Sequence, residues 1–315
     1  MDSRLIRSTL LPLVAVAFTT AAAEAQDSFT DPSGYVQVTV AANTLGVLSA
    51  TLANKSEFTG NITINNDWDP GAAGPPVIPP SQTITVSPDP GWGGTQWTAT
   101  PHVIYVVDSN GAEETFLITG NTSDTLTIIS RYDLLLRISA STSASIRAAQ
   151  TLSSIFGTPA DSPLSTGTSS SGDAVYVWTG TSWQRFYINS TRTQWRSTGF
   201  GDKSNTVIFS DEGTFVQNTQ GTDVTFTMFG DPAIRDRIST VEGAGLYFDS
   251  MQFPVPVTIG TLGYQNLPNW VTGTSSSGDA IYVWNPGPPG SWTRYYYNGT
   301  NWRSTGSVSY THLTL

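Results

Sequence analysis

The chain contains one unusual segment twice. Residues 166–178 read TGTSSSGDAVYVW, and residues 272–284 read TGTSSSGDAIYVW. The match resumes at residues 195–199 and 302–306, which both read WRSTG, after intervening stretches of slightly different length. Insertions between matched blocks mark loops, whereas the blocks themselves mark a conformational unit. We therefore expect one structural unit that is built twice.

Each copy is predicted to form a three-stranded antiparallel meander. In residues 173–178, small or β-branched residues alternate with bulkier ones, and a period of two is typical of a strand. A turn then precedes a second aromatic strand over 183–188, and a polar turn leads to a short strand at Trp195. In the second copy the first turn, residues 285–290, must leave the sheet because its prolines lack an N–H group.

The composition agrees with an all-β protein. Glycine (29) and proline (19) separate short apolar runs, as in proteins made of many turns. Charged residues make up only 12%, and 10 tryptophans favour packed sheets over a disordered chain. The best helical segments are residues 144–156 and 231–241. We predict an all-β fold of serial small β-sandwich or β-barrel modules, built from antiparallel hairpins with an internal repeat.

The N-terminal residues predict export. Arg4 and Arg7 precede an apolar run over residues 10–18, and Ala-Glu-Ala at residues 23–25 matches a cleavage site. Residues 1–25 are therefore a predicted signal peptide, too short for a membrane span. The chain has no cysteine, so it depends on its sheets rather than on disulfides. We expect a secreted or cell-surface protein with no transmembrane segment after cleavage.

Turn and strand patterns divide the chain further. The predicted parts are a signal peptide (1–25), an N-terminal β module (26–130), a β module with the first hairpin copy (131–230), a module with the second copy (231–306) and a tail (307–315). The second copy lacks a counterpart of residues 200–230, so we expect the natural protein to continue further. The tail resembles translated sequencing adapter and is expected to be non-native.

Several short segments resemble a known group of proteins. They are residues 30–36 (TDPSGYV), 58–60 (FTG), 115–122 (TFLITGNT), 125–127 (TLT) and the hairpin repeat. Together they are similar to an uncharacterised family of exported, Gly/Ser/Thr- and aromatic-rich β proteins of verrucomicrobial-type bacteria. The resemblance implies export and a β structure, and it implies no activity, catalytic residue or cofactor.

Residues suited to catalysis are sparse. His312 lies in the predicted tail, which leaves His102 as the one imidazole for a Ser/His/Asp arrangement, and we interpret it as a polar strand end. Glycoside hydrolysis needs two carboxylates across a cleft. The candidates, none within a recognisable signature, are Glu113, Glu114, Asp211, Glu212, Glu242 and Asp249. We predict no enzymatic activity and no catalytic residue.

One loop has some features of a metal site. Residues 108–113 (DSNGAE) place oxygen ligands around a glycine turn, as in calcium loops, but without the full spacing or the distal glutamate. Asp and Asn in hairpin turns more often bond to the backbone. A zinc site would have too few ligands. We predict no metal and no cofactor.

The aromatic residues of the repeat are the candidate ligand-binding residues. They are Trp178, Trp183, Tyr187 and Trp195 in the first copy and Trp284, Trp292, Tyr296 and Trp302 in the second. Such rings stack on the apolar faces of sugars, while Arg185 or Arg294 would donate to hydroxyls. Alternatively, the rings form cross-strand pairs in a core, each contributing about 0.2–1 kcal/mol. Core packing is the commoner use of buried aromatic residues.

These observations favour an exported, non-enzymatic β protein with a structural role at the cell surface or outside the cell. The alternative is a carbohydrate- or matrix-binding adhesin that uses the repeat's aromatic residues. Its partners would be extracellular polysaccharide or cell-surface components. The net charge of −10 argues against nucleic acid as a partner. A third alternative is a polysaccharide-active enzyme.

Overall fold

Antiparallel strands make up most of the computed structural model. It describes residues 34–72, 78–179, 182–199, 201–237, 245–250, 257–285 and 290–305. About 45% of the chain is strand and 6% is helix, which confirms the all-β prediction. None of the described helices is long and apolar enough to cross a membrane. The predicted signal peptide and tail lie outside the described residues.

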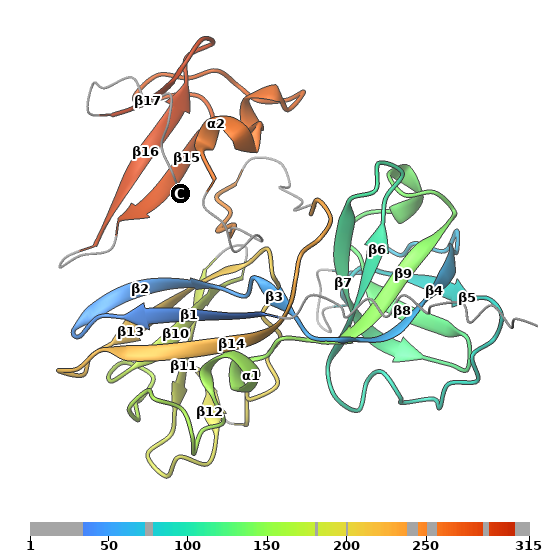
Figure 1. The fold of residues 1–315 in the computed structure, drawn as a ribbon, viewed down its shortest axis with the longest axis horizontal. Helices are drawn as coiled ribbons and strands as arrows, with labels where there is room; N and C mark the ends of the chain where they lie inside the picture. The colour runs from blue at the N-terminus through green and yellow to red at the C-terminus, as the bar shows by residue number, and fades with distance from the viewer. Residues whose placement is uncertain are drawn as a thin grey trace, which may run out of the picture. The chain divides into compact units, whose positions relative to one another are not determined.

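Two sheets share one core in the part of the chain that contains the first repeat, and we call this pair the sandwich (Figure 1). One sheet has the order β1 (Gly34–Val40), β14 (Val224–Pro232), β3 (Leu52–Ala53). The other has the order β12 (Trp195–Arg196), β11 (Trp183–Ile188), β10 (Ala174–Trp178), β13 (Gly213–Asn218), β2 (Thr44–Ser49). The core therefore combines residues that are far apart in the sequence.

Alternation along the strands builds this core. Val36, Val38 and Val40 follow each other at every second position of β1, and they face the core between the sheets. Trp195 is the largest fully buried side chain, and its indole N–H donates to the carbonyl oxygen of Gly157 at 3.1 Å. A short helix, α1 (Leu152–Phe156), packs into the same core. The burial of these apolar side chains stabilises the sandwich.

A six-stranded closed barrel lies between β3 and α1 in the sequence (Figure 1). Its order is β4 (Ser56–Ile64), β5 (Ser81–Val86), β8 (Thr125–Ile129), β7 (Glu113–Asn121), β6 (His102–Val107), β9 (Ser141–Ala148). Isoleucine, leucine and valine side chains fill its interior, so it is a packed core. The first strand, β4, pairs with the last, β9, and the chain therefore enters and leaves the barrel at neighbouring strands.

The second repeat forms a separate three-stranded sheet. Its order is β15 (Ala280–Asn285), β16 (Ser291–Tyr297), β17 (Trp302–Ser304). A short helix, α2 (Ile259–Leu262), precedes it, as α1 precedes the first copy. A 3-10 turn, η2 (Tyr264–Asn266), follows α2, and another, η1 (Leu134–Leu136), lies between β8 and β9 of the barrel. A small core of Ile259, Tyr295 and Trp302 lies beneath the sheet.

The two copies have the same pairing. Trp178 lies opposite Trp183, as Trp284 lies opposite Trp292. The third strand adds next to the second in both, at β12 and at β17. The predicted three-stranded antiparallel meander is therefore confirmed in both copies. The helices α1 and α2 also begin alike, each with a capping box of two hydroxyl side chains.

The predicted helices are largely wrong. Of residues 144–156, only Leu152–Phe156 is helical, because the preceding stretch belongs to β9 and pairs with both β4 and β6. These two neighbours satisfy the backbone groups of β9, which overrides its local helix preference. Of residues 231–241, the first two end β14, residues 233–237 contain no helix, and the rest lie outside the described residues.

Long-range pairing also departs from the predicted division at residue 130. β1 and β2, which lie in the predicted N-terminal module, pair with β14 and β13 of the sandwich. The barrel extends past residue 130 to include β9. Pairing between segments so distant in sequence leaves no local signal, so turn spacing alone could not indicate it.

The repeated Thr-Gly-Thr-Ser-Ser-Ser-Gly segment is a tight loop. Its last glycine has a positive φ in both copies, 76° at Gly172 and 70° at Gly278. A Cβ atom on Gly172 would lie 2.6 Å from the carbonyl oxygen of Thr166, and one on Gly278 would lie 2.6 Å from that of Thr272. Only glycine fits such a position, which explains why both copies have glycine there.

We predict that Gly172→Ala destabilises the sandwich by about 1–3 kcal/mol, because alanine meets both the strained φ and the Thr166 carbonyl. Urea unfolding followed by tryptophan fluorescence measures the change. Gly221→Ala is the control, because a Cβ atom there meets nothing within 4 Å, and its effect is expected to stay within about 0.5 kcal/mol. Equal stability of the two variants would contradict this account of the loop.

Candidate ligand-binding site

Arg185 holds the repeated loop in the first copy. Its guanidinium donates to the carbonyl oxygens of Thr168, of Ser171 at 2.9 Å and of Gly172 at 2.8 Å. Its Nε–H donates to the hydroxyl of Tyr176 at 3.2 Å. Most of the donors of this side chain are therefore engaged within the protein.

Arg294 makes the same contacts in the second copy. It donates to the carbonyl oxygens of Thr274 at 2.5 Å, Ser277 at 2.9 Å and Gly278 at 3.1 Å. The expectation that Arg185 or Arg294 donates to sugar hydroxyls is therefore replaced by a structural role. A planar, forked donor suits this task because it can bond several carbonyl oxygens at once.

The eight aromatic residues predicted from the repeat divide between the two faces of each sheet. Trp195 and Trp302 are buried in the cores, at 0% and 6% exposure, so for them the core-packing alternative holds. Trp183 and Trp292 lie on the opposite faces and are 38% and 43% exposed. The period of two along β11 and β16 places Tyr187 and Tyr296 on the same faces as these two tryptophans.

The two tyrosines of the set lie against the loop arginines. The centre of the Tyr187 ring is 5.6 Å from the Arg185 guanidinium carbon, and Tyr296 lies at the same distance from Arg294. Such a contact is a cation–π interaction that helps to fix the arginine. Tyr187 and Tyr296 therefore support the loop and are not free to stack on a ligand.

The paired tryptophans belong to a larger group of rings, which we call the aromatic cluster. Trp178 packs against Trp183, and Trp284 against Trp292, with ring centres 5.1 Å apart in both pairs. Phe215 of β13 lies 5.0 Å from Trp183 and 5.0 Å from Trp284. The members of the cluster are Trp178, Trp183, Phe215, Phe248, Trp284 and Trp292.

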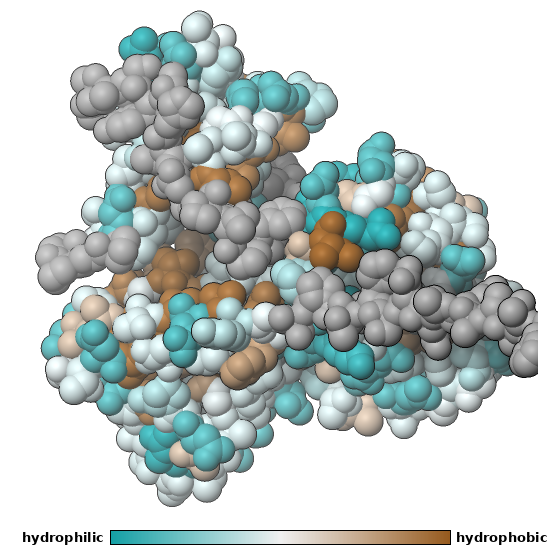
Figure 2. All heavy atoms as spheres, in the orientation of Figure 1, coloured by the Kyte–Doolittle hydropathy of each residue, from teal (hydrophilic) through white to brown (hydrophobic). Residues whose placement is uncertain are grey.

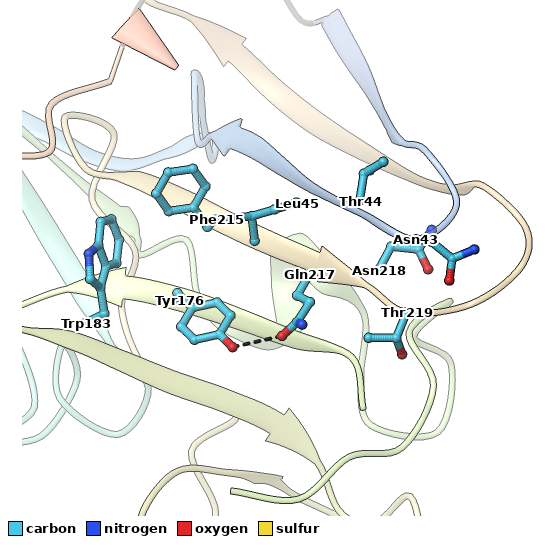
Figure 3. Close-up of a pocket in the computed structure, with 9 residues that line it drawn as sticks. All are labelled: Asn43, Thr44, Leu45, Tyr176, Trp183, Phe215, Gln217, Asn218 and Thr219. Atoms are coloured by element: carbon cyan, nitrogen blue, oxygen red, sulfur yellow. Dashed lines mark hydrogen bonds between the residues drawn. The ribbon is translucent and has the colours of Figure 1, made fainter. Parts of the chain in front are cut away.

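A pocket of about 530 Å³ adjoins two members of this cluster, Trp183 and Phe215, on the outer face of the five-stranded sheet (Figure 3). Volumes of this order are common for small-molecule sites. Its lining comes from β2, β10, β11, β13 and the turns at their ends. The lining residues are Asn43, Thr44, Leu45, Tyr176, Trp183, Phe215, Gln217, Asn218 and Thr219.

The pocket combines rings with carboxamides. Trp183, Tyr176 and Phe215 provide apolar surface on one side, and Gln217 lies beside them on β13 (Figure 3). The hydroxyl of Tyr176 donates to Oε1 of Gln217 at 2.8 Å, which leaves the Gln217 amide N–H groups without a partner among the described residues. Asn43 is exposed at the tip of a turn with φ of 55°. Both carboxamides can therefore bond to a ligand.

The lining contains no charged side chain, as far as the described residues show. Beneath it, the amide of Asn218 donates to the carbonyl oxygens of Val40 at 3.2 Å and Ala41 at 3.1 Å. The backbone N–H and hydroxyl of Thr219 donate to Asp173 at 2.7 and 2.6 Å. Asn218 and Thr219 therefore fix the shape of the pocket rather than bind a ligand.

Asp173 anchors this region. Burial alone would raise the pKa of its carboxyl, but hydrogen bonds from Thr219 and Ser165 hold that pKa below its usual value. The role of this carboxylate is not only local, because its Oδ1 accepts from a residue 46 positions away. Charge-assisted hydrogen bonds of this kind are about twice as strong as neutral ones.

Apolar surface occurs in separated patches on the visible face of the molecule (Figure 2). Residues outside the pocket contribute to this apolar surface. The exposed pair Tyr35 and Phe229 lies on the outer face of the three-stranded sheet, with ring centres 6.3 Å apart. Neither residue lines the pocket beside Trp183 or a second pocket of about 460 Å³ on the barrel, which is lined by Asp108, Asn110, Ala112, Glu114, Arg137 and Ile138.

The candidate carboxylates lie outside the pocket. Glu113 pairs with Arg237 at 3.1 Å, and Glu114 accepts a hydrogen bond from Tyr132 in the barrel. Glu212 bridges to Asp249 through the backbone. Asp211 directly precedes Glu212 in the sequence, and Glu242 lies outside the described residues. None of the described candidates lines the pocket beside Trp183, whereas Glu114 lines the second pocket, on the barrel, with Asp108 and Arg137.

The carboxylate of the loop at 108–113 and the imidazole of His102 bond to the backbone. The carboxylate of Asp108 accepts the backbone N–H groups of Asn110 and Ala112, each at 2.8 Å, so it stabilises the turn. His102 is buried at the start of β6, where Nδ1 lies 2.8 Å from the Thr100 carbonyl oxygen. The residues that the structure describes contain no cluster of three or more His, Cys, Asp or Glu side chains placed to hold a metal.

Comparison with known proteins gives no assignment. No protein-family model, curated protein or solved structure matches the chain.

Glu212 gives the protein a testable dependence on pH. Burial, and then the charge of Asp211, raises the pKa of Glu212 from 4.5 to about 7. A raised pKa favours the folded state while the group is protonated. This contribution to stability is therefore complete below about pH 4.5 and is lost as the pH rises through 7.

We predict that Glu212→Gln is more stable than the wild type at pH 8 by about 1–3 kcal/mol, and that this difference shrinks at pH 5. Urea unfolding at both pH values measures it. Asp89→Asn, in an exposed turn of the barrel, is the control and should follow the wild type. A wild-type protein that gains stability over the same pH interval relative to Glu212→Gln would contradict the burial of this carboxyl.

Proposed function

We propose that this protein is exported, acts without catalysis at the cell surface or outside the cell, and binds a neutral carbohydrate in the pocket beside Trp183. The observation that carries the proposal is the lining of the pocket, where three aromatic rings adjoin two available carboxamides. The predicted signal peptide supports the location. Extracellular polysaccharide or cell-surface glycan is the expected partner.

The chemistry of the lining favours a sugar over other small ligands. A pyranose ring presents apolar C–H faces, which stack on an indole such as Trp183, and hydroxyl groups, which bond to carboxamides such as Gln217 and Asn43. Anionic ligands would need a cation, and the described lining contains none. A neutral, ring-shaped and hydroxyl-rich ligand therefore fits the groups that are present.

A purely structural role is the second candidate. The aromatic cluster favours it, because its rings pack on one another rather than stand apart as a binding platform. Trp195 and Trp302 likewise stabilise cores. In this case the protein would contribute to an extracellular layer, and the pocket would have no ligand.

A polysaccharide-active enzyme remains a prediction without support from the pocket. Glycoside hydrolysis needs a pair of carboxylates beside the sugar, and the described lining residues include no Asp or Glu. The proposal of binding without catalysis is consistent with that lining.

Binding can be tested on a panel of neutral polysaccharides, including β-glucans, xylan and mannan, by affinity electrophoresis and calorimetry. We expect at least one of them to bind, and Trp183→Ala to weaken the affinity about tenfold because the stacking surface is lost. Gln217→Leu should weaken it several-fold through the lost amide donors.

Tyr35→Ala is the matched control, because it removes an aromatic side chain that is 67% exposed and lies outside the pocket. Its affinity should equal that of the wild type. Circular dichroism establishes that each variant is folded. If no polysaccharide binds, or if Trp183→Ala and Tyr35→Ala bind equally well, the structural role is favoured.

A further inference from the structure

The two copies of the repeat differ in what lies beside their first strand. In the first copy, β10 pairs with β11 on one side and with β13 on the other. In the second copy, β15 pairs with β16, and no described residue pairs with its other side. An unpaired strand edge presents a row of N–H and C=O groups that can accept another strand.

The first copy shows what such a strand would look like. Along β10 and β13, Ala174 lies opposite Gln217, Tyr176 opposite Phe215, and Val177 opposite Thr214. The equivalent residues of β15 are Ala280, Tyr282 and Val283, which follow the same alternation. A strand with the sequence of β13 would therefore fit this edge in the same register.

The aspartate that precedes the first strand of each copy provides independent evidence that a strand is missing beside β15 among the described residues. Asp173 accepts from the backbone N–H of Ser165 at 2.7 Å and, through its other oxygen, from Thr219 just after β13. Asp279 accepts from Val271, the equivalent of Ser165, also at 2.7 Å. The other oxygen of Asp279 has no partner in the part of the chain that the structure describes.

Equivalent side chains of the two copies also differ in exposure. Asp173 is 1% exposed, whereas Asp279 is exposed. Tyr176 is half-buried and donates to Gln217 of β13, whereas Tyr282 is 46% exposed. Each difference is located where β13 and the residue after it complete the first copy.

We propose that the free edge of β15 accepts an extended segment of another polypeptide with the chemistry of residues 214–219, Thr-Phe-Val-Gln-Asn-Thr. In this chain β13 is already paired on both sides, with β10 and with β2, so the occupant is a different strand of the same type. Its glutamine accepts from the hydroxyl of Tyr282, and its last threonine donates to Asp279. Backbone pairing supplies the remaining contacts, as in other cases of strand addition.

A peptide with the sequence of residues 212–221, carrying a fluorescent label, tests the proposal on the full chain. Fluorescence anisotropy should show saturable binding. Asp279→Asn should weaken it about fivefold, because an amide oxygen accepts less strongly than a carboxylate but still accepts from Val271. Asp89→Asn, an aspartate variant in a barrel turn, should leave the binding unchanged. No binding of the peptide, or equal binding by both variants, would overturn the proposal.

Two further peptides test whether the contact is strand pairing. Each is N-methylated at alternate residues, one at the even positions and one at the odd positions. Only every second N–H group of a strand points toward a given neighbour, so one of these peptides should lose binding and the other should keep it. Loss of both, or of neither, would contradict pairing along β15.

Hydrogen exchange locates the edge in the protein itself. In the free protein we expect alternate amides of β15 to exchange at least about tenfold faster than those of β10, and to slow when the peptide binds. If the amides of β15 are already as protected as those of β10, the chain's own residues cover this edge and the proposal is wrong. Protection that appears at β10 instead would mean that the peptide displaces β13, which also overturns it.

Discussion

β13 determines the arrangement of the sandwich, because it is the strand that joins the first repeat to the N-terminal strands. It pairs with β10 on one side and with β2 on the other, and its buried residues, such as Val216, contribute to the shared core. Phe215 and Gln217, on its opposite face, line the pocket. The same six residues thus contribute to the core, to the register of the sheet and to the candidate site.

The repeat shows how much of a small β unit is specified locally. In both copies a glycine with positive φ ends the loop, and an arginine from the second strand bonds to three carbonyl oxygens of that loop. This combination requires no partner from elsewhere in the chain. The exposure of the first strand of each copy depends instead on the strand beside it. It differs between β10 and β15 because only β10 pairs with β13.

The sequence was sufficient to predict features that depend on nearby residues, such as the two meanders. It was insufficient where partners are distant. The stretch before α1 has helix-forming residues, yet its position between two barrel strands makes it β9. The pocket was missed because Asn43, Tyr176 and Gln217 come from three separate strands or turns. Alternation in 213–218 could have shown that Phe215 and Gln217 share a face, although not what lies beside them.

The barrel is joined to the sandwich through two strands that lie side by side. Ser56 of β4 is opposite Arg147 of β9, and the amide of Asn54 donates to the carbonyl oxygen of Ala148 at 2.9 Å. Because the two connections are adjacent, any closed unit with neighbouring ends could occupy this place while the strand order of its host stayed the same. The junction is therefore a natural boundary for gain, loss or exchange of a whole module.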